Sequence, residues 1–404
     1  MCDNYFRYYY HTRYTMIEKN ITFIYMDSAE KEIMKPLAEE AKKRGYQVKL
    51  TTNKFEKCEI GVYCQHVNFP QYSKFSIIML HDIIQQYGNW PDIWFREPWD
   101  KYDIGILPSD QWVTNWNKCS QWSYANPRVG MYKVGWPKAD IVANINREQY
   151  RIAFYKKYNL DIRKKTVLYA PSWENDNKQD DFVKAVRTMD VNILIKQYPA
   201  TMEVQPQQYK NIKAMYELHK NDRRVTILDP KMNIFNAILA ADLLVSEESS
   251  TMAEALMMGI PSISVSDWLI PDVTPSRFPE CNYEFVIMTK KAELAKCIDN
   301  IIKNYGTYKQ NAEEWKNKLF CNIGKSSCII MDIIDDCVQA KKIRYEALKP
   351  NPKEKIPFVK KLKHVYICMC REITLNYSER SKLIAVTWRI LRMAKKWISG
   401  FNNK

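Results

Sequence analysis

Short apolar runs alternate with longer amphipathic runs along most of this chain, and this alternation constrains the fold more than any other feature. Runs with the length and content of buried strands lie at 21–26, 47–50, 60–63, 76–80, 104–107 and 131–134. The run from 29 to 44 has apolar residues at helical spacing and ends at Gly45, a residue that favours helix termination. Strands that alternate with helices predict a mainly parallel sheet with both faces covered.

The same pattern starts again after a basic, helix-like segment at 147–158. Strands are predicted at 166–169, 191–195, 225–228, 243–245 and 261–265, and helices at 182–189, 234–241 and 251–258. From about residue 292 the pattern is mostly helical. Because 404 residues fit two domains of ordinary size, we predict two Rossmann-like domains at 1–150 and 151–345, followed by a helical tail at 346–404.

The net charge of the chain is +15, and much of it lies in the tail, where residues 358–404 carry eleven Lys or Arg and two Glu. Apolar residues at helical spacing between 383 and 398, with Lys and Arg among them, predict a basic amphipathic helix. Such a helix is typical of a segment that lies in a membrane interface. The alternatives are a helix packed on the protein's own core and a nucleic-acid-binding face. Since no nucleic-acid recognition motif accompanies the charge, we expect a membrane surface and no nucleic acid.

The eleven cysteines form no Cys-x-x-Cys pair, which is typical of a reducing compartment and gives no zinc-binding spacing. No run is long enough to span a bilayer, and residues 1–14 lack the apolar run of a signal peptide. We therefore expect a cytoplasmic protein, peripheral on the inner face of the plasma membrane, that uses no metal and no cofactor.

A hydroxyl-rich run follows one predicted strand of the second half, and ligands of open α/β sheets bind beside the carboxyl ends of strands. Ser249, Ser250 and Thr251 stand where the next helix begins, where N–H groups and hydroxyls favour a phosphate. Glu254 lies one turn further and suits hydrogen bonds to ribose hydroxyls. Glu247 would point away from a phosphate, or bind a cation or sugar hydroxyls. Alternatively, Ser249 is only a helix cap and Glu254 is solvated.

Two further strand ends of the second half carry candidate ligand-binding residues. Pro171 and Ser172 follow its first strand, and Lys196 and Tyr198 follow its second. Lys196 could neutralise a phosphate, and Tyr198 could donate a hydrogen bond to a developing charge. Alternatively, the prolines at these positions only end the strands and Lys196 is a surface charge.

The first half offers His81 at the carboxyl end of an apolar strand. A histidine there can act as a general base, because its ordinary pKa lies near working pH. Asp82 follows as a second catalytic candidate, although adjacency in sequence does not by itself place it to orient the ring. His66 is a weaker candidate base. The alternative for each is a structural histidine.

These strand ends, in this order, resemble the CDP-glycerol glycerophosphotransferase family of teichoic acid and capsule polymer synthesis over about residues 77–302. Residues 169–173 match the family's Tyr-Ala-Pro-Thr-Trp, and residues 134–138 its strand followed by Gly-Tyr-Pro. Residues 244–250 resemble its Leu-Ile-Asp-x-Ser-Ser signature. The sequence departs from the family at Tyr198, where the family's Lys-Leu-His-Pro has histidine, and at Asp82, where its His-Gly has glycine.

The resemblance implies a GT-B fold, in which two Rossmann-like domains face a cleft. It implies that His81 is the base on an acceptor hydroxyl and that Ser249, Ser250 and Glu254 bind the donor. It also implies that Gly135 and Pro137 lie on the acceptor side.

The resemblance also implies a function. We expect transfer of glycerol phosphate, or a related polyol phosphate, from a CDP-activated donor to a hydroxyl of a lipid-linked surface-polymer intermediate. One alternative is a GT-B glycosyltransferase that uses a UDP- or GDP-sugar. The other is a non-catalytic membrane-binding protein on the same fold.

Overall fold

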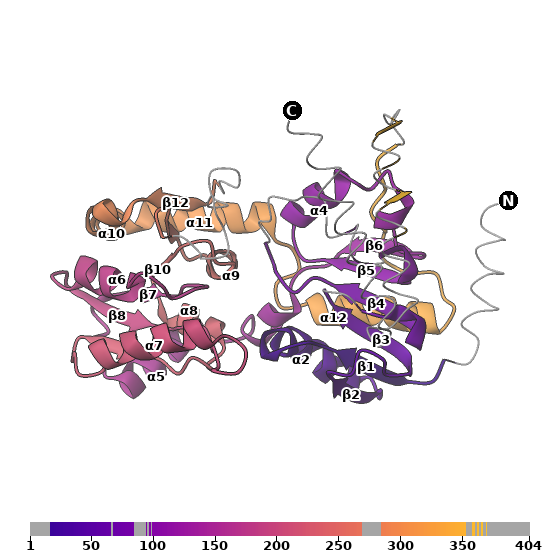
Figure 1. The fold of residues 1–404 in the computed structure, drawn as a ribbon, viewed down its shortest axis with the longest axis horizontal. Helices are drawn as coiled ribbons and strands as arrows, with labels where there is room; N and C mark the ends of the chain where they lie inside the picture. The colour runs from indigo at the N-terminus through magenta and orange to yellow at the C-terminus, as the bar shows by residue number, and fades with distance from the viewer. Residues whose placement is uncertain are drawn as a thin grey trace.

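The computed structural model describes residues 17–65, 68–84, 99–268 and 284–352, together with positions 94, 97, 358, 359, 362, 365, 366 and 369. It contains two six-stranded sheets, each covered by helices (Figure 1). The strand orders are β2-β1-β3-β4-β5-β6 and β12-β11-β10-β7-β8-β9. Every pairing in both sheets is parallel, so the prediction of two Rossmann-like halves is confirmed.

The first half supplies the sheet β1–β6 and the helices packed on it. Its elements are β1 (Asn20–Ile24), α2 (Ser28–Lys43), β2 (Gln47–Thr51), β3 (Cys58–Cys64), β4 (Ser73–Met79), β5 (Ile104–Leu107), α4 (Asp110–Asn117), β6 (Gly130–Lys133) and the 3-10 helix η4 (Pro137–Ile141).

The second half supplies the sheet β7–β12. Its elements are α5 (Arg147–Tyr158), β7 (Lys165–Tyr169), α6 (Lys178–Val186), β8 (Val191–Ile195), α7 (Pro206–His219), β9 (Val225–Ile227), α8 (Ile234–Ala240), β10 (Leu243–Ser246), α9 (Thr251–Met257), β11 (Ser262–Val265), β12 (Val286–Thr289), α10 (Leu294–Lys303) and α11 (Tyr305–Leu319). Within the described residues, the strands and helices predicted from the sequence are present within a few residues, whereas α4, α7 and β12 were not predicted.

The last described helix, α12 (Ser326–Val338), returns to the first half, where Figure 1 shows it among the labels of β1–β6. Arg44, at the end of α2, donates hydrogen bonds to Asp332 (2.7 Å) and Asp335 (2.8 Å) on α12. These contacts fix α12 on α2. The domain ranges 1–150 and 151–345 stay a prediction, and α12 is a part of the second range that packs on the first.

The register of the second sheet aligns three strand ends that carry candidate residues. Val245 of β10 pairs with Tyr169 of β7, and Tyr169 pairs with Ile195 of β8. Since parallel strands end at the same edge of a sheet, the segments after these three residues lie side by side. The fold therefore brings together the three strand ends that the sequence singled out.

Some predictions fall outside the described residues, among them His66 and the amphipathic segment at 383–398. Within the part of the chain that the structure describes, no helix is both long enough and apolar enough to cross a membrane.

Candidate functional site

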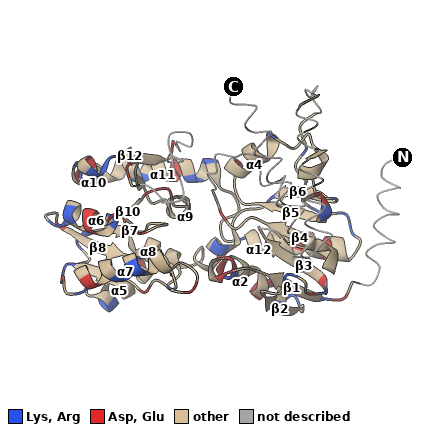
Figure 2. Ribbon diagram, viewed as in Figure 1, with Lys and Arg blue, Asp and Glu red and all other residues tan. Residues whose placement is uncertain are grey.

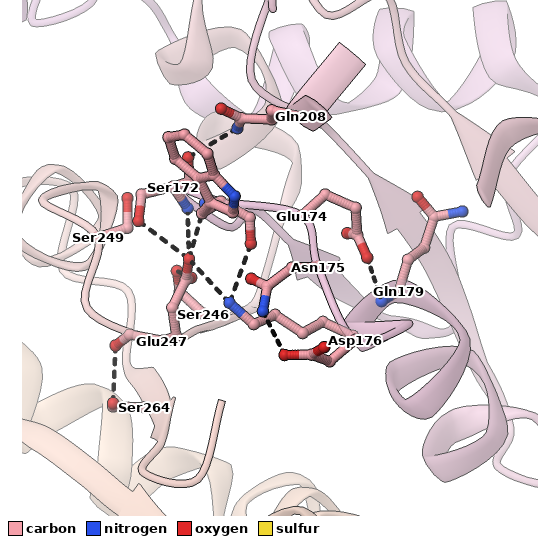
Figure 3. Close-up of polar contacts among 12 residues, drawn as sticks. Ser172, Glu174, Asn175, Asp176, Gln179, Gln208, Ser246, Glu247, Ser249 and Ser264 are labelled. Atoms are coloured by element: carbon pink, nitrogen blue, oxygen red, sulfur yellow. Dashed lines mark hydrogen bonds and ion pairs between the residues drawn. The ribbon is translucent and has the colours of Figure 1, made fainter. Parts of the chain in front are cut away.

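Glu247 is the centre of the polar contacts at these strand ends, and its side chain is fully buried. Its Oε1 accepts hydrogen bonds from the Ser172 amide (2.8 Å), the Ser172 hydroxyl (2.9 Å) and the Trp173 amide (2.9 Å). Its Oε2 accepts one from the Ser246 hydroxyl (2.9 Å), as Figure 3 shows. A carboxylate satisfied in this way ties the turn after β7 to the end of β10. Glu247 thus points into the protein, one of the two orientations that the sequence left open.

Lys178 supplies the positive charge beside Glu247, and no pattern in the sequence predicts this role. Its Nζ lies 3.9 Å from Glu247 Oε1 and donates to the Trp173 carbonyl oxygen (3.0 Å). Its side chain is almost fully buried, and this burial lowers the pKa of Lys178, while Glu247 opposes the shift. A buried charge of this kind is stable only with its partner in place, so the pair fixes the turn that carries Pro171 and Ser172.

A second layer of contacts supports the end of β8. Glu174 is fully buried and accepts hydrogen bonds from the Tyr169 hydroxyl (2.8 Å) and the Gln197 side-chain amide (2.6 Å). Burial raises the pKa of Glu174. Because Gln197 stands between Lys196 and Tyr198, this layer holds the backbone of both candidate residues.

The hydroxyls at the start of α9 form a local cluster. The Thr251 hydroxyl donates to Ser249 Oγ (3.0 Å) and to the Ala170 carbonyl oxygen (3.2 Å). Ser249 Oγ also accepts a weaker bond from the Thr251 amide (3.3 Å). Ser249 is buried, whereas Ser250 and Thr251 are partly exposed. Ser249 is thus tied into this turn, but the N-cap residue of α9 is Ser250, whose side chain makes no capping bond.

One small pocket lies between the two halves at this turn. It is lined by Ile84 from the segment after β4, by Phe285, and by Glu248, Ser249, Ser250, Met252 and Ala253 around the start of α9. Ile84 lies three residues after His81 in the same segment. The segment after β4 and the predicted donor turn thus line the same opening from opposite halves, and Ile84, not His81, is the residue of that segment that lines it.

His81 lies immediately beyond β4 and is partly exposed. Its Nε2 is 3.5 Å from Asp82 Oδ2, so these two neighbours do lie close enough to interact. The segment is held from behind, because Trp112 Nε1 donates to the Asp82 carbonyl oxygen (3.0 Å) and the Ser109 hydroxyl donates to the Ile83 carbonyl oxygen (3.1 Å). This arrangement fixes the backbone that carries both candidate catalytic side chains.

Glu254 forms an ion pair with a residue of the first half. Its Oε1 is 2.6 Å from Nζ of Lys138, which lies in η4 just beyond β6. Lys196 is also near this pair, buried, and donates to the Pro230 carbonyl oxygen (3.0 Å). Burial, followed by repulsion from Lys138, lowers the pKa of Lys196 to about 8. Lys138 lies in the stretch 134–138 that resembles the family motif, but the sequence does not predict it as a site residue.

Tyr198 also faces the first half. Burial, followed by the charge of Asp27, raises the pKa of Tyr198, while a hydrogen bond with Gln205 opposes the shift. Asp27 is the N-cap of α2, where its carboxylate accepts bonds from the Ala29 and Glu30 amides. Tyr198 therefore keeps its proton at neutral pH and remains a hydrogen-bond donor.

Gly135 and Pro137 lie in the first half, and Gly135 is beside the segment through which the chain returns from the second half before α12. Gly135 has a φ of +116°, and a Cβ added there would lie 2.6 Å from the Cys321 carbonyl oxygen. Pro137 is buried at the start of η4. The glycine is thus explained by the close passage of the segment before α12, and an acceptor-side role for either residue stays a prediction.

Comparisons with known proteins identify relatives of this arrangement. A family model described as CDP-Glycerol:Poly(glycerophosphate) glycerophosphotransferase matches residues 86–333. No curated protein matches the chain.

Several solved structures share the fold. The wall teichoic acid polymerase TagF has a TM-score of 0.55 at 16% identity, covering 84% of this chain and 96% of that chain. A structure of a TagF variant soaked with CDPG has a TM-score of 0.57 at 16% identity, covering 82% and 92%. The UDP co-structure of MnaA from S. aureus has a TM-score of 0.52 at 13% identity, covering 82% and 100%. These similarities agree with the predicted GT-B fold.

Proposed function

The chain belongs to the CDP-glycerol:poly(glycerophosphate) glycerophosphotransferase family, and on that premise we propose that it transfers glycerol phosphate from CDP-glycerol to a hydroxyl of a lipid-linked surface-polymer intermediate. It is a transferase of the glycerophosphotransferase type. The observation that carries the proposal is the alignment of three polar strand ends at one edge of the second sheet, where Ser249 and Ser250 meet Ile84, a residue of the segment after β4, at a small pocket.

His81 is the proposed base. In the reaction, the acceptor oxygen forms a bond to the phosphorus that carries glycerol, and the bond from that phosphorus to the bridging oxygen of the diphosphate breaks. The acceptor proton passes to His81, and CMP leaves with the bonding electrons. The Asp82 carboxylate, 3.5 Å from Nε2, stabilises the imidazolium that forms.

The donor side uses the three aligned strand ends. Ser249, Ser250 and Thr251 offer hydroxyls to the donor diphosphate, and Lys196 offers positive charge. Tyr198, where the family has histidine, donates a hydrogen bond to the charge that develops on the leaving phosphate. The turn of Pro171 and Ser172 completes this wall of the site. Glu247 acts through that turn, since its hydrogen bonds fix Ser172.

Glu254 is the proposed partner of the donor ribose. Its position in the first turn of α9 places it beside the serine turn, and a carboxylate can accept hydrogen bonds from both ribose hydroxyls. No step of this scheme is assigned to a metal or a cofactor.

The membrane is the proposed location of the acceptor. Phe358, Leu362, Val365 and Met369 follow each other at helical spacing, and each is more than half exposed. Figure 2 shows Lys and Arg interspersed with Asp and Glu over both halves, whereas the tail at 358–404 holds nine of the fifteen net positive charges. An apolar stripe inside a basic segment favours the cytoplasmic surface of a membrane with anionic lipids.

Replacement of His81 tests the chemical part of the proposal. We expect His81→Ala to lower the rate of CMP release from CDP-glycerol by about 100-fold or more, because a positioned base contributes on this order. Donor affinity, measured by calorimetry on the same variant, should stay within about twofold of wild type. Near-normal turnover of the variant would rule out His81 as the base.

A glycosyltransferase that uses a UDP-sugar is the second candidate. This candidate is kept because the chain has a fold similar to that of MnaA, whose solved structure contains UDP. Binding measurements with cytidine, uridine and guanosine donors separate this candidate from the first.

A further inference from the structure

Lys138 and Glu254 form a charged contact between the two halves. Lys138 Nζ lies 2.6 Å from Glu254 Oε1, and their side chains are only 15% and 5% exposed. Lys138 Nζ also lies 5.8 Å from the ring centroid of Phe235 on α8. The side chain of Lys138 therefore extends from the first half to a position between α8 and α9 of the second.

The base of Lys138 is held firmly in the first half. It lies on η4, where Asp140 accepts hydrogen bonds from the amides of Ser326 (3.2 Å) and Ser327 (2.6 Å) at the start of α12. Helix α12 in turn is fixed on α2 through Arg44. The distance from the ammonium group to α9 therefore depends on the position of the first half.

Separation of the halves would leave both charges without their main partner. Lys196 is a further charge near the pair, and Lys138 repels it while Glu254 attracts it. A carboxylate that has lost Lys138 would therefore turn toward Lys196, away from its present direction. The direction of the Glu254 carboxylate depends on the approach of the two halves.

We propose that Lys138 is a positioning residue, which orients the Glu254 carboxylate from the opposite half and so couples donor binding to the approach of the halves. The inference rests on the proposed function, because it takes Glu254 as the partner of the donor ribose. Lys138 itself need not touch the donor. Its loss should weaken binding of substrate and transition state equally, which raises KM and leaves kcat nearly unchanged.

The test compares four full-length proteins: wild type, Lys138→Met, Lys138→Arg and Lys133→Met. Methionine keeps the length of lysine without its charge, and arginine keeps the charge. Lys133 is the matched control, because it forms a lysine–carboxylate pair with Asp110 (2.8 Å) inside one half. CDP-glycerol affinity is measured by calorimetry, KM and kcat by CMP release, and the halves' approach by X-ray scattering with and without CDP-glycerol.

We expect Lys138→Met to weaken CDP-glycerol binding and raise KM by about tenfold, with kcat within about twofold of wild type. Its compaction on adding CDP-glycerol should be reduced. Lys138→Arg should restore most of the affinity, and Lys133→Met should behave as wild type. Melting temperatures of all four proteins identify a variant that has lost its fold.

Three results would overturn the inference. If Lys138→Met binds CDP-glycerol as tightly as wild type, or if Lys138→Arg and Lys138→Met lose affinity equally, Lys138 is only a packing contact and the proposed function stands. If wild type binds no CDP-glycerol, the proposed function fails and the inference fails with it.

Discussion

Lys196 is a residue whose charge state should be visible in binding. Lys138, Glu254 and Asp229 are the charged groups that act on it. Burial, followed by repulsion from Lys138, lowers the pKa of Lys196 to about 8. The ammonium form therefore prevails below about pH 8 and is lost above it. Since the charged form attracts the donor diphosphate, bound donor should raise this pKa again.

We therefore predict that affinity for CDP-glycerol falls as the pH rises from 7 to 9, with proton uptake on binding near pH 8. The diphosphate of CDP-glycerol is a diester and does not titrate in this range, so the dependence belongs to the protein. Calorimetry in two buffers of different ionisation enthalpy measures the proton uptake. Lys196→Met should bind more weakly at pH 7 and show a flat profile; an unchanged profile in this variant would assign the effect to another group.

The candidate site shows which residues a sequence can identify. Ser249, Ser250 and Glu254 could be singled out because polar residues at a strand end are conspicuous in an apolar pattern. The inward direction of Glu247 could not be chosen, because it depends on amides of the turn after β7, more than seventy residues away. Lys178 gave no signal at all, since a lysine near a helix start normally indicates a solvated surface.

At the level of helices and strands, the apolar pattern predicted most of the elements that bury one face against a sheet, although it missed α4 and β12. Helix α7 lacked such a signal, because only Gln208, Met215 and His219 of its fourteen residues are buried. The apolar pattern also does not predict that α12 returns to the first half, because apolar residues predict burial but not the surface that they contact. In the structure, α12 shares a hydrophobic cluster with α2, and Arg44 adds ion pairs to Asp332 and Asp335 at this contact.

Substitution of Gly135 tests how closely the segment before α12 passes the first half. We predict that Gly135→Ala lowers the free energy of unfolding by about 1–3 kcal/mol, because its φ is left-handed and its Cβ would meet the Cys321 carbonyl oxygen. Gly306→Ala is the matched control: it lies in α11 with no atom near its added Cβ, so stability should stay equal or rise by up to about 1 kcal/mol. Urea unfolding of both variants checks this, and equal effects would contradict the account.

At the scale of the whole molecule, the tail and the two halves are expected to serve different steps. Deletion of residues 358–404 should weaken binding to vesicles with anionic lipid by about 100-fold or more, because each basic residue near such a surface contributes about 1 kcal/mol. Turnover on a soluble acceptor should persist. Co-sedimentation with anionic and with neutral vesicles measures the first effect. A truncated chain that still binds anionic vesicles as tightly as the full chain would show that the membrane contact lies elsewhere.

The central claim is that the two halves bind a cytidine nucleotide, and a thermal-shift series tests this claim most directly. The full chain is heated with CDP-glycerol, CMP, a UDP-sugar and a GDP-sugar, each at about 100 times the expected Kd, where specific binding adds about 2.7 kcal/mol of stability. The account predicts that CDP-glycerol and CMP raise the Tm by several degrees and that the two sugar nucleotides do not. A Tm that rises with the UDP- or GDP-sugar and not with the cytidine compounds would contradict it.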